Sequence, residues 1–117
     1  MMKAFGAEIT DVKSDRKRIT ETLIKEMIAT SKRIAERPGH WWSDQLTNRD
    51  AIAGYYPLGE EIWSQTGGRV DAFVQAVGTA HSIHGATKAL RMHTSELHVA
   101  AVEPAESAVL SGGPTVS

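Results

Sequence analysis

No cysteine occurs in the sequence. Disulfides, thiolate nucleophiles and thiolate metal sites are therefore excluded. No apolar run approaches the roughly 20 residues that span a membrane, and the first six residues lack the apolar core of a signal peptide. In the absence of these signals, we expect a cytoplasmic protein that does not bind a membrane.

An excess of charge of either sign is also lacking. The chain has 13 basic and 14 acidic residues, which gives a formal net charge of −1. Binding to nucleic acid needs a basic surplus or stripe, so nucleic acid is not an expected partner. Of the 117 residues, 41% are hydrophobic and 23% are charged, a balance typical of a globular chain of one domain's size.

The hydrophobic pattern predicts strands that alternate with helices. Strands are expected over 7–12, 70–77 and 97–102, with an extended segment at 41–43. Helices are expected from Ile19 to just before Pro38, from Pro57 to Gly67, and from the 78–82 turn to about His93. The two later strands are apolar on both faces, as buried parallel strands are. This order predicts an α/β fold with a mostly parallel sheet, helical crossovers and three αβα layers.

The turn Gly78-Thr79-Ala80-His81-Ser82 joins a predicted strand to a predicted helix. The first N–H groups of a helix have no partner within it, and together with the helix dipole they favour an anion such as phosphate. Gly78 permits close approach of a ligand, Thr79 and Ser82 offer hydroxyls, and His81 adds a charge when protonated. The alternative interpretation is that Thr79 or Ser82 only caps the helix.

Two other features are candidate sites. His81 and His84 are three residues apart and share one side of a helix, but a metal site needs further ligands, so no metal is assigned. Glu103 follows the last predicted strand and either contacts a ligand or holds a loop. The structural interpretation of Glu103 is preferred.

Two longer segments carry a family resemblance. Residues 59–74 (GEEIWSQTGGRVDAFV) and 102–113 (VEPAESAVLSGG) resemble the centre of cysteine synthase. The similarity is collinear over nearly the whole chain and is most specific over 54–113. The wider family is the cysteine synthase and cystathionine β-synthase group of fold-type II enzymes, which depend on pyridoxal phosphate (PLP).

The resemblance implies roles for two segments. The 78–82 turn takes the place of the family's Gly-Thr-Gly-Gly-Thr loop, which grips the cofactor phosphate. Ala80 and His81 replace two glycines of that loop, and Ser82 replaces its threonine. Gln45 takes the place of a glutamine near the substrate carboxylate. PLP is therefore the cofactor that the resemblance implies, held without a covalent bond.

The resemblance also implies that catalytic parts are missing. The family's Schiff-base lysine lies upstream of the matched region, and the group that contacts the pyridine nitrogen lies downstream. No catalytic residue is assigned, and the chain is expected to be a truncated piece of such an enzyme, inactive alone. Residues 1–53 would form part of the smaller domain as a βα segment, and 54–117 part of the larger one as an αβαβ segment.

Three functional hypotheses stay open at this point. The first is a PLP-family chain with a residual phosphate site. The second is an oligomerisation or interaction module without cofactor, which acts through sheet edges or the Trp41-Trp42 pair. The third is a complete enzyme that uses Lys13 or Lys88. Open sheet edges invite pairing with another chain, so a homo-oligomer, with or without exchanged elements, is the expected partner.

Overall fold

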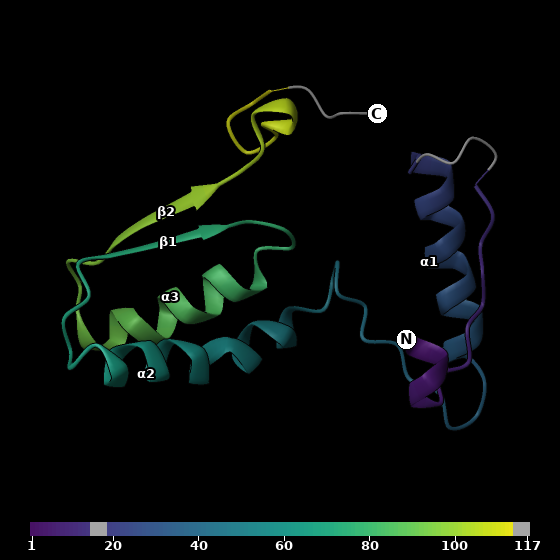
Figure 1. Cartoon of the computed structure of the whole chain (residues 1–117), viewed down its shortest axis with the longest axis horizontal. Coiled ribbons are helices and arrows are strands. Elements are labelled where there is room, and N and C mark those ends of the chain that lie inside the picture. Colours follow the sequence, from purple (N-terminus) through teal and green to yellow (C-terminus); the bar gives the residue numbers. More distant parts are fainter. Residues whose placement is uncertain (15–18, 114–117) are drawn as a thin grey trace. The chain divides into compact units, whose positions relative to one another are not determined.

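The computed structural model describes residues 1–14 and 19–113. The chain divides into two compact units, one that runs to Trp42 and one that begins at Ser43 (Figure 1). Each unit is described by itself below. None of the helices in the described segments is long and apolar enough to cross a membrane.

The first unit contains the 3₁₀ helix η1 (Met2–Phe5) and the helix α1 (Glu21–Ala35). Thr20 begins α1 because its hydroxyl oxygen accepts the N–H of Leu23 at 3.2 Å. The predicted strand over 7–12 and the extended segment at 41–43 are not strands. A strand requires a ladder partner, and the described residues of this unit supply none to either segment.

The second unit starts with two consecutive helices. The 3₁₀ helix η2 (Arg49–Tyr55) is capped by Asn48, whose side-chain oxygen accepts the N–H of Asp50 at 3.1 Å. It leads directly into α2 (Tyr56–Gln65), which has a proline in its first turn. The predicted loop over 44–54 is therefore wrong in its second half. Gly67 and Gly68 have φ values of 62° and 75°, and these left-handed conformations end α2 as predicted.

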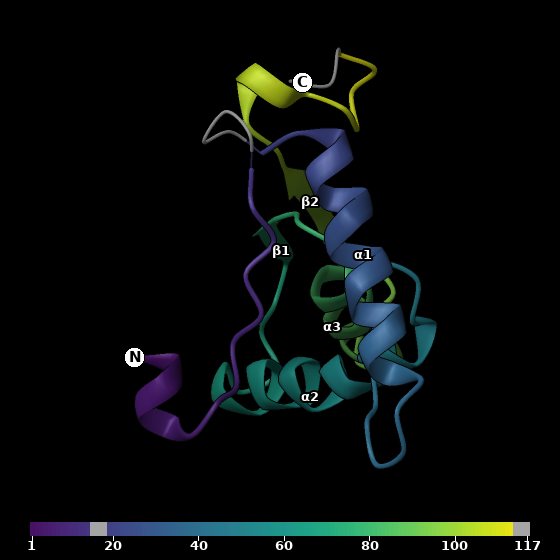
Figure 2. The same cartoon turned by 90° about the vertical axis from the view of Figure 1, so that its right-hand side faces the viewer.

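The rest of the second unit is a β-α-β segment. Strands β1 (Ala72–Ala76) and β2 (His98–Val102) pair in parallel, and α3 (His81–His93) connects them. Ala72 is opposite His98 and Ala76 is opposite Val102. Both views place α3 between the sheet and α2 (Figures 1 and 2). The α/β class and the parallel pairing are confirmed.

Small residues allow α3 to pack closely against its neighbours. Ala86, Ala89 and Leu90 of α3 are essentially fully buried. A Cβ atom on Gly59 of α2 would lie 2.6 Å from both the Ala86 carbonyl oxygen and the Ala89 Cβ. A Cβ atom on Gly85 would collide with the Ile52 carbonyl oxygen of η2. Glycine is therefore required where α2 and η2 cross α3.

The two strands are less covered than their sequence predicts. Val74 of β1 is 61% exposed and Val102 of β2 is 48% exposed. In β1, exposed and half-buried residues alternate along the strand. Parallel strands normally have cover on both faces, whereas in the described residues one face of this sheet stays open. The prediction of fully buried strands is wrong for this chain taken alone.

Candidate functional site

A pocket of about 350 Å³ lies between the first turn of α3 and the segment that leads into η2. Thr79, Ala80 and His81 line one side of it. Thr47, Arg49 and Ile52 are among the residues from the other segment. Part of the 78–82 turn thus faces a cavity large enough for a small molecule.

No side chain of the described residues caps the N-terminus of α3. Ala80 precedes the helix with a φ of 64°, a left-handed conformation that is uncommon for a residue with a side chain. Thr79 Oγ1 pairs with His81 Nδ1 at 3.1 Å, and the Ser82 hydroxyl pairs with the Gln75 amide at 2.5 Å. The capping interpretation of Thr79 and Ser82 is therefore wrong. The N–H groups of the first turn and the positive end of the dipole remain available for an anion.

His81 is held in place at the pocket. Only 8% of the residue is exposed, and the bond to Thr79 engages one ring nitrogen. The other ring nitrogen, Nε2, has no partner in the part of the chain that the structure describes. A nearly buried imidazole with one uncommitted nitrogen can donate to a ligand in the cavity.

The pocket lining contains one permanent cation and two imidazoles. Arg49 carries a permanent charge, and His84 lines the pocket together with His81. Among the described residues, no carboxylate lines the cavity, although Asp44 accepts a hydrogen bond from the hydroxyl of Thr47 on the loop side. This lining favours an anionic ligand.

The other predicted site residues do not line this pocket. Gln45 is exposed and stays outside the lining, while Ser82 turns toward Gln75. Gly78 also lies outside the lining, and a Cβ atom there would meet nothing within 4 Å. The sequence does not point to Arg49, because the polar pattern of residues 44–54 predicts a loop.

None of the described lysines lines the pocket. The Lys88 ammonium lies 5.3 Å from the centre of the Tyr56 ring, and Lys88 lines a separate groove. Lys13 belongs to the other unit. Within the described ranges, no group of three histidines, aspartates or glutamates has the arrangement of a metal site.

Glu103 holds the loop that follows β2, as the structural interpretation predicts. Its carboxylate accepts the N–H groups of Leu110 and Ser111 at 2.7 and 2.9 Å, and the Ser111 hydroxyl at 2.6 Å. The hydrogen bond from the Ser111 hydroxyl, helped by the two N–H groups, lowers the pKa of Glu103 below its ordinary value.

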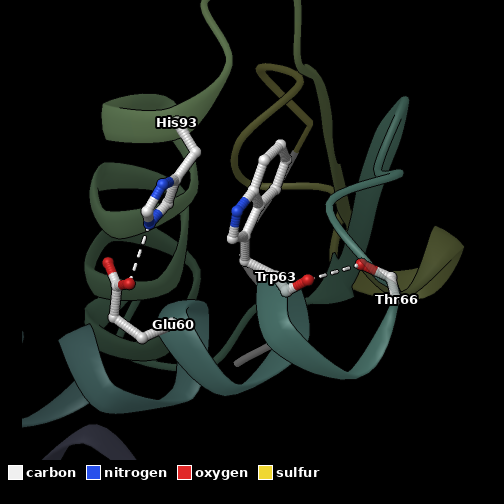
Figure 3. Close-up of polar contacts among 4 residues, drawn as sticks. All are labelled: Glu60, Trp63, Thr66 and His93. Carbon is white, nitrogen blue, oxygen red and sulfur yellow. Dashed lines mark hydrogen bonds and ion pairs between the residues drawn. The ribbon is translucent and has the colours of Figure 1, made fainter.

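A polar contact outside the pocket joins α2 to the end of α3 (Figure 3). His93 Nε2 lies 2.8 Å from the Glu60 carboxylate, and the His93 ring stacks on Trp63 with 4.9 Å between ring centres. On α2 itself, the Thr66 hydroxyl donates to the Trp63 carbonyl at 3.1 Å. These contacts lie outside the pocket lining and fix the packing of the two helices.

The chain is similar to known enzymes along nearly its whole length. Residues 1–115 match the family model described as "Pyridoxal-phosphate dependent enzyme". Cysteine synthase 3 of Caenorhabditis elegans is 34% identical over 115 residues, which cover 97% of this chain and 33% of that protein. Cysteine synthase B of Escherichia coli K12 is 33% identical over 113 residues, which cover 95% of this chain and 35% of that protein.

A solved structure supports the same relation. The cysteine synthase of Entamoeba histolytica superposes with a TM-score of 0.81 at 35% identity, over 99% of this chain and 33% of that one. The chain therefore spans about one third of the length of the relatives it matches. From the extent of the family match, the chain belongs to the pyridoxal-phosphate dependent enzymes, and within them it is related to the cysteine synthases.

Proposed function

We propose that this chain is a cysteine synthase-like member of the PLP family that binds phosphate groups at the α3 pocket and is not catalytic alone. The pocket would hold inorganic phosphate or the phosphate of PLP without a covalent bond. The observation that carries this proposal is the uncapped N-terminus of α3, which faces a cavity beside the buried ring of His81.

The residues present fit a phosphate group. Backbone N–H groups at a helix N-terminus bind phosphate readily, and the lining adds the Thr79 hydroxyl and the His81 ring. His81 offers an imidazole donor in place of one of the glycines that the resemblance places in this loop. When protonated, its bond to a phosphate oxygen is charge-assisted.

The residues present do not fit the reactive end of the cofactor. When bound, PLP supplies an electron sink for reactions of amino acids, and in such enzymes a lysine holds it as a Schiff base. No lysine in the described part of the chain lines the pocket. We therefore expect the chain alone to form no cysteine from O-acetylserine, whereas complete cysteine synthases make this product.

The direct test is a titration of the purified chain with PLP, followed by tryptophan fluorescence and visible absorbance. Saturable quenching in the low micromolar range that inorganic phosphate abolishes is the expected result. His81→Ala should weaken the binding, whereas His98→Ala on the exposed strand β2 should leave it unchanged. Quenching that does not saturate would contradict the proposal.

A second candidate function is an interaction module that self-associates. A groove of about 500 Å³ along α3 and β2 is lined by residues that include Ile83, Met92 and Val99. Met92 is 78% exposed, and in the described residues each strand of the sheet has one unpaired edge. Sedimentation at micromolar concentration should show a dimer or larger species. A single monomeric species would remove this candidate.

A further inference from the structure

We propose that the α3 pocket accepts a small molecule with two negative groups, a phosphate at the helix N-terminus and a carboxylate at Arg49. This inference rests on the proposed phosphate site and adds a second contact point to it. The ligand class is a phosphorylated organic acid.

The first observation is that Arg49 is an uncommitted cation. It lines the pocket, and no ion pair or hydrogen bond of its guanidinium occurs in the described part of the chain. A planar guanidinium binds carboxylate through two parallel hydrogen bonds. Arg49 is therefore available for an acidic group in the cavity.

The second observation is that Arg49 and the residues at the phosphate end belong to two different elements that pack closely on each other. Arg49 opens η2, whereas Thr79 and His81 belong to the start of α3. The two elements pack so closely that a Cβ atom on Gly85 would lie 2.7 Å from the Tyr55 Cβ and would also meet the Ile52 carbonyl oxygen. Two anion-binding groups on backbones that pack this closely select a ligand by the spacing of its charges.

The size and the remaining lining of the cavity agree with this class. A volume of about 350 Å³ lies within the range of small-molecule pockets, so it has room for carbon atoms beside the phosphate. Leu46 and Ile52 add apolar surface to the same wall as Arg49. A short carbon chain between the two acidic groups would contact these side chains.

The test compares two probes that have the same phosphate and the same number of carbons. Glycerol 3-phosphate ends in a hydroxymethyl group, and 3-phosphoglycerate ends in a carboxylate. Calorimetric titration at low ionic strength should show that the native chain binds 3-phosphoglycerate about threefold to tenfold more tightly. Arg49→Gln should abolish that preference and change the affinity for glycerol 3-phosphate by less than about twofold.

A matched control separates a local contact from general attraction. Arg69→Gln removes the same charge from an exposed loop position outside the pocket lining, so it should preserve the preference. Equal binding of the two probes by the native chain would overturn the inference. An equal loss for both probes in Arg49→Gln would also overturn it, because Arg49 would then hold the phosphate itself.

The two proposals fail in different ways. If inorganic phosphate and PLP bind but the two probes bind equally, the phosphate site stands and the carboxylate contact is refuted. If no phosphate compound binds, the phosphate site is refuted and this inference is overturned with it.

Discussion

The contact between Gly85 of α3 and η2 gives the sharpest structural prediction. In Gly85→Ala the new methyl group would lie 2.7 Å from the Tyr55 Cβ and would also meet the Ile52 carbonyl oxygen. Backbone atoms cannot rotate away as a flexible side chain does, so η2 has to move relative to α3. The same movement would separate Arg49 and Ile52 from the first turn of α3 and widen the pocket.

Two opposing effects set the magnitude for Gly85→Ala. Overpacking of a tight contact costs about 1–3 kcal/mol, and the cost belongs at the upper end because a main-chain oxygen is involved. Replacing glycine by alanine in a helix stabilises it by about 1 kcal/mol. The expected net loss is about 2 kcal/mol, or about 8–16 °C in melting temperature for a domain of 60–100 residues.

Thermal unfolding followed by circular dichroism measures this loss, and Gly54→Ala is the matched control. Gly54 lies in η2, and a Cβ atom there would meet nothing within 4 Å, so the control should change stability by less than about 1 kcal/mol. Gly85→Ala should also weaken phosphate binding, whereas the control should not. Equal melting temperatures for the two variants would refute the proposed packing of η2 on α3.

Two further predictions concern the core and the loop after β2. Leu90 is fully buried, so Leu90→Ala should lower the free energy of unfolding by about 2–5 kcal/mol in urea denaturation, and a loss below about 1 kcal/mol would contradict its place in the core. Glu103 has a lowered pKa in the folded chain, so its carboxylate stabilises the loop above its unfolded pKa of about 4.3, and this stabilisation is lost as pH falls through the folded value. The protection factors of the Leu110 and Ser111 amides, which compare each exchange rate with the intrinsic rate at the same pH, should therefore fall below about pH 4 in the native chain and should already be low at neutral pH in Glu103→Gln. Unchanged protection in the variant would refute this role.

The helices could be predicted well because local signals determine them. The stop at Gly67 and Gly68 and the end of α3 near His93 agree with the structure. The spacing of apolar residues marks a helix, and glycine marks its end. Both signals span only a few residues. These helices can therefore be predicted without knowing which distant segments they contact.

The strands were predicted less well because strands depend on partners. Residues 7–12 alternate as a strand does, yet the described residues of their unit offer no ladder to join. Val74 was predicted to be buried and is exposed, because the sequence pattern records an apolar environment that these residues alone do not supply. The apolar pattern indicates that a strand needs cover on its faces, but other elements must supply that cover.

The site was predictable only in part. The 78–82 turn pointed to the N-terminus of α3, and the structure places three of its residues in the pocket lining. The role of Arg49 could not be predicted, because its place depends on a short 3₁₀ helix and on the approach of η2 to Gly85. The phosphate-binding roles assigned to the turn stay predictions.

A nuclear magnetic resonance titration of the isotopically labelled chain with inorganic phosphate tests the central proposal most directly. We predict saturable shifts concentrated on the backbone amides of the first turn of α3 and on the ring of His81. Amides of α1 and β2, which lie outside the pocket lining, serve as internal controls. Shifts spread evenly over the chain, or none at the start of α3, would contradict a phosphate site there.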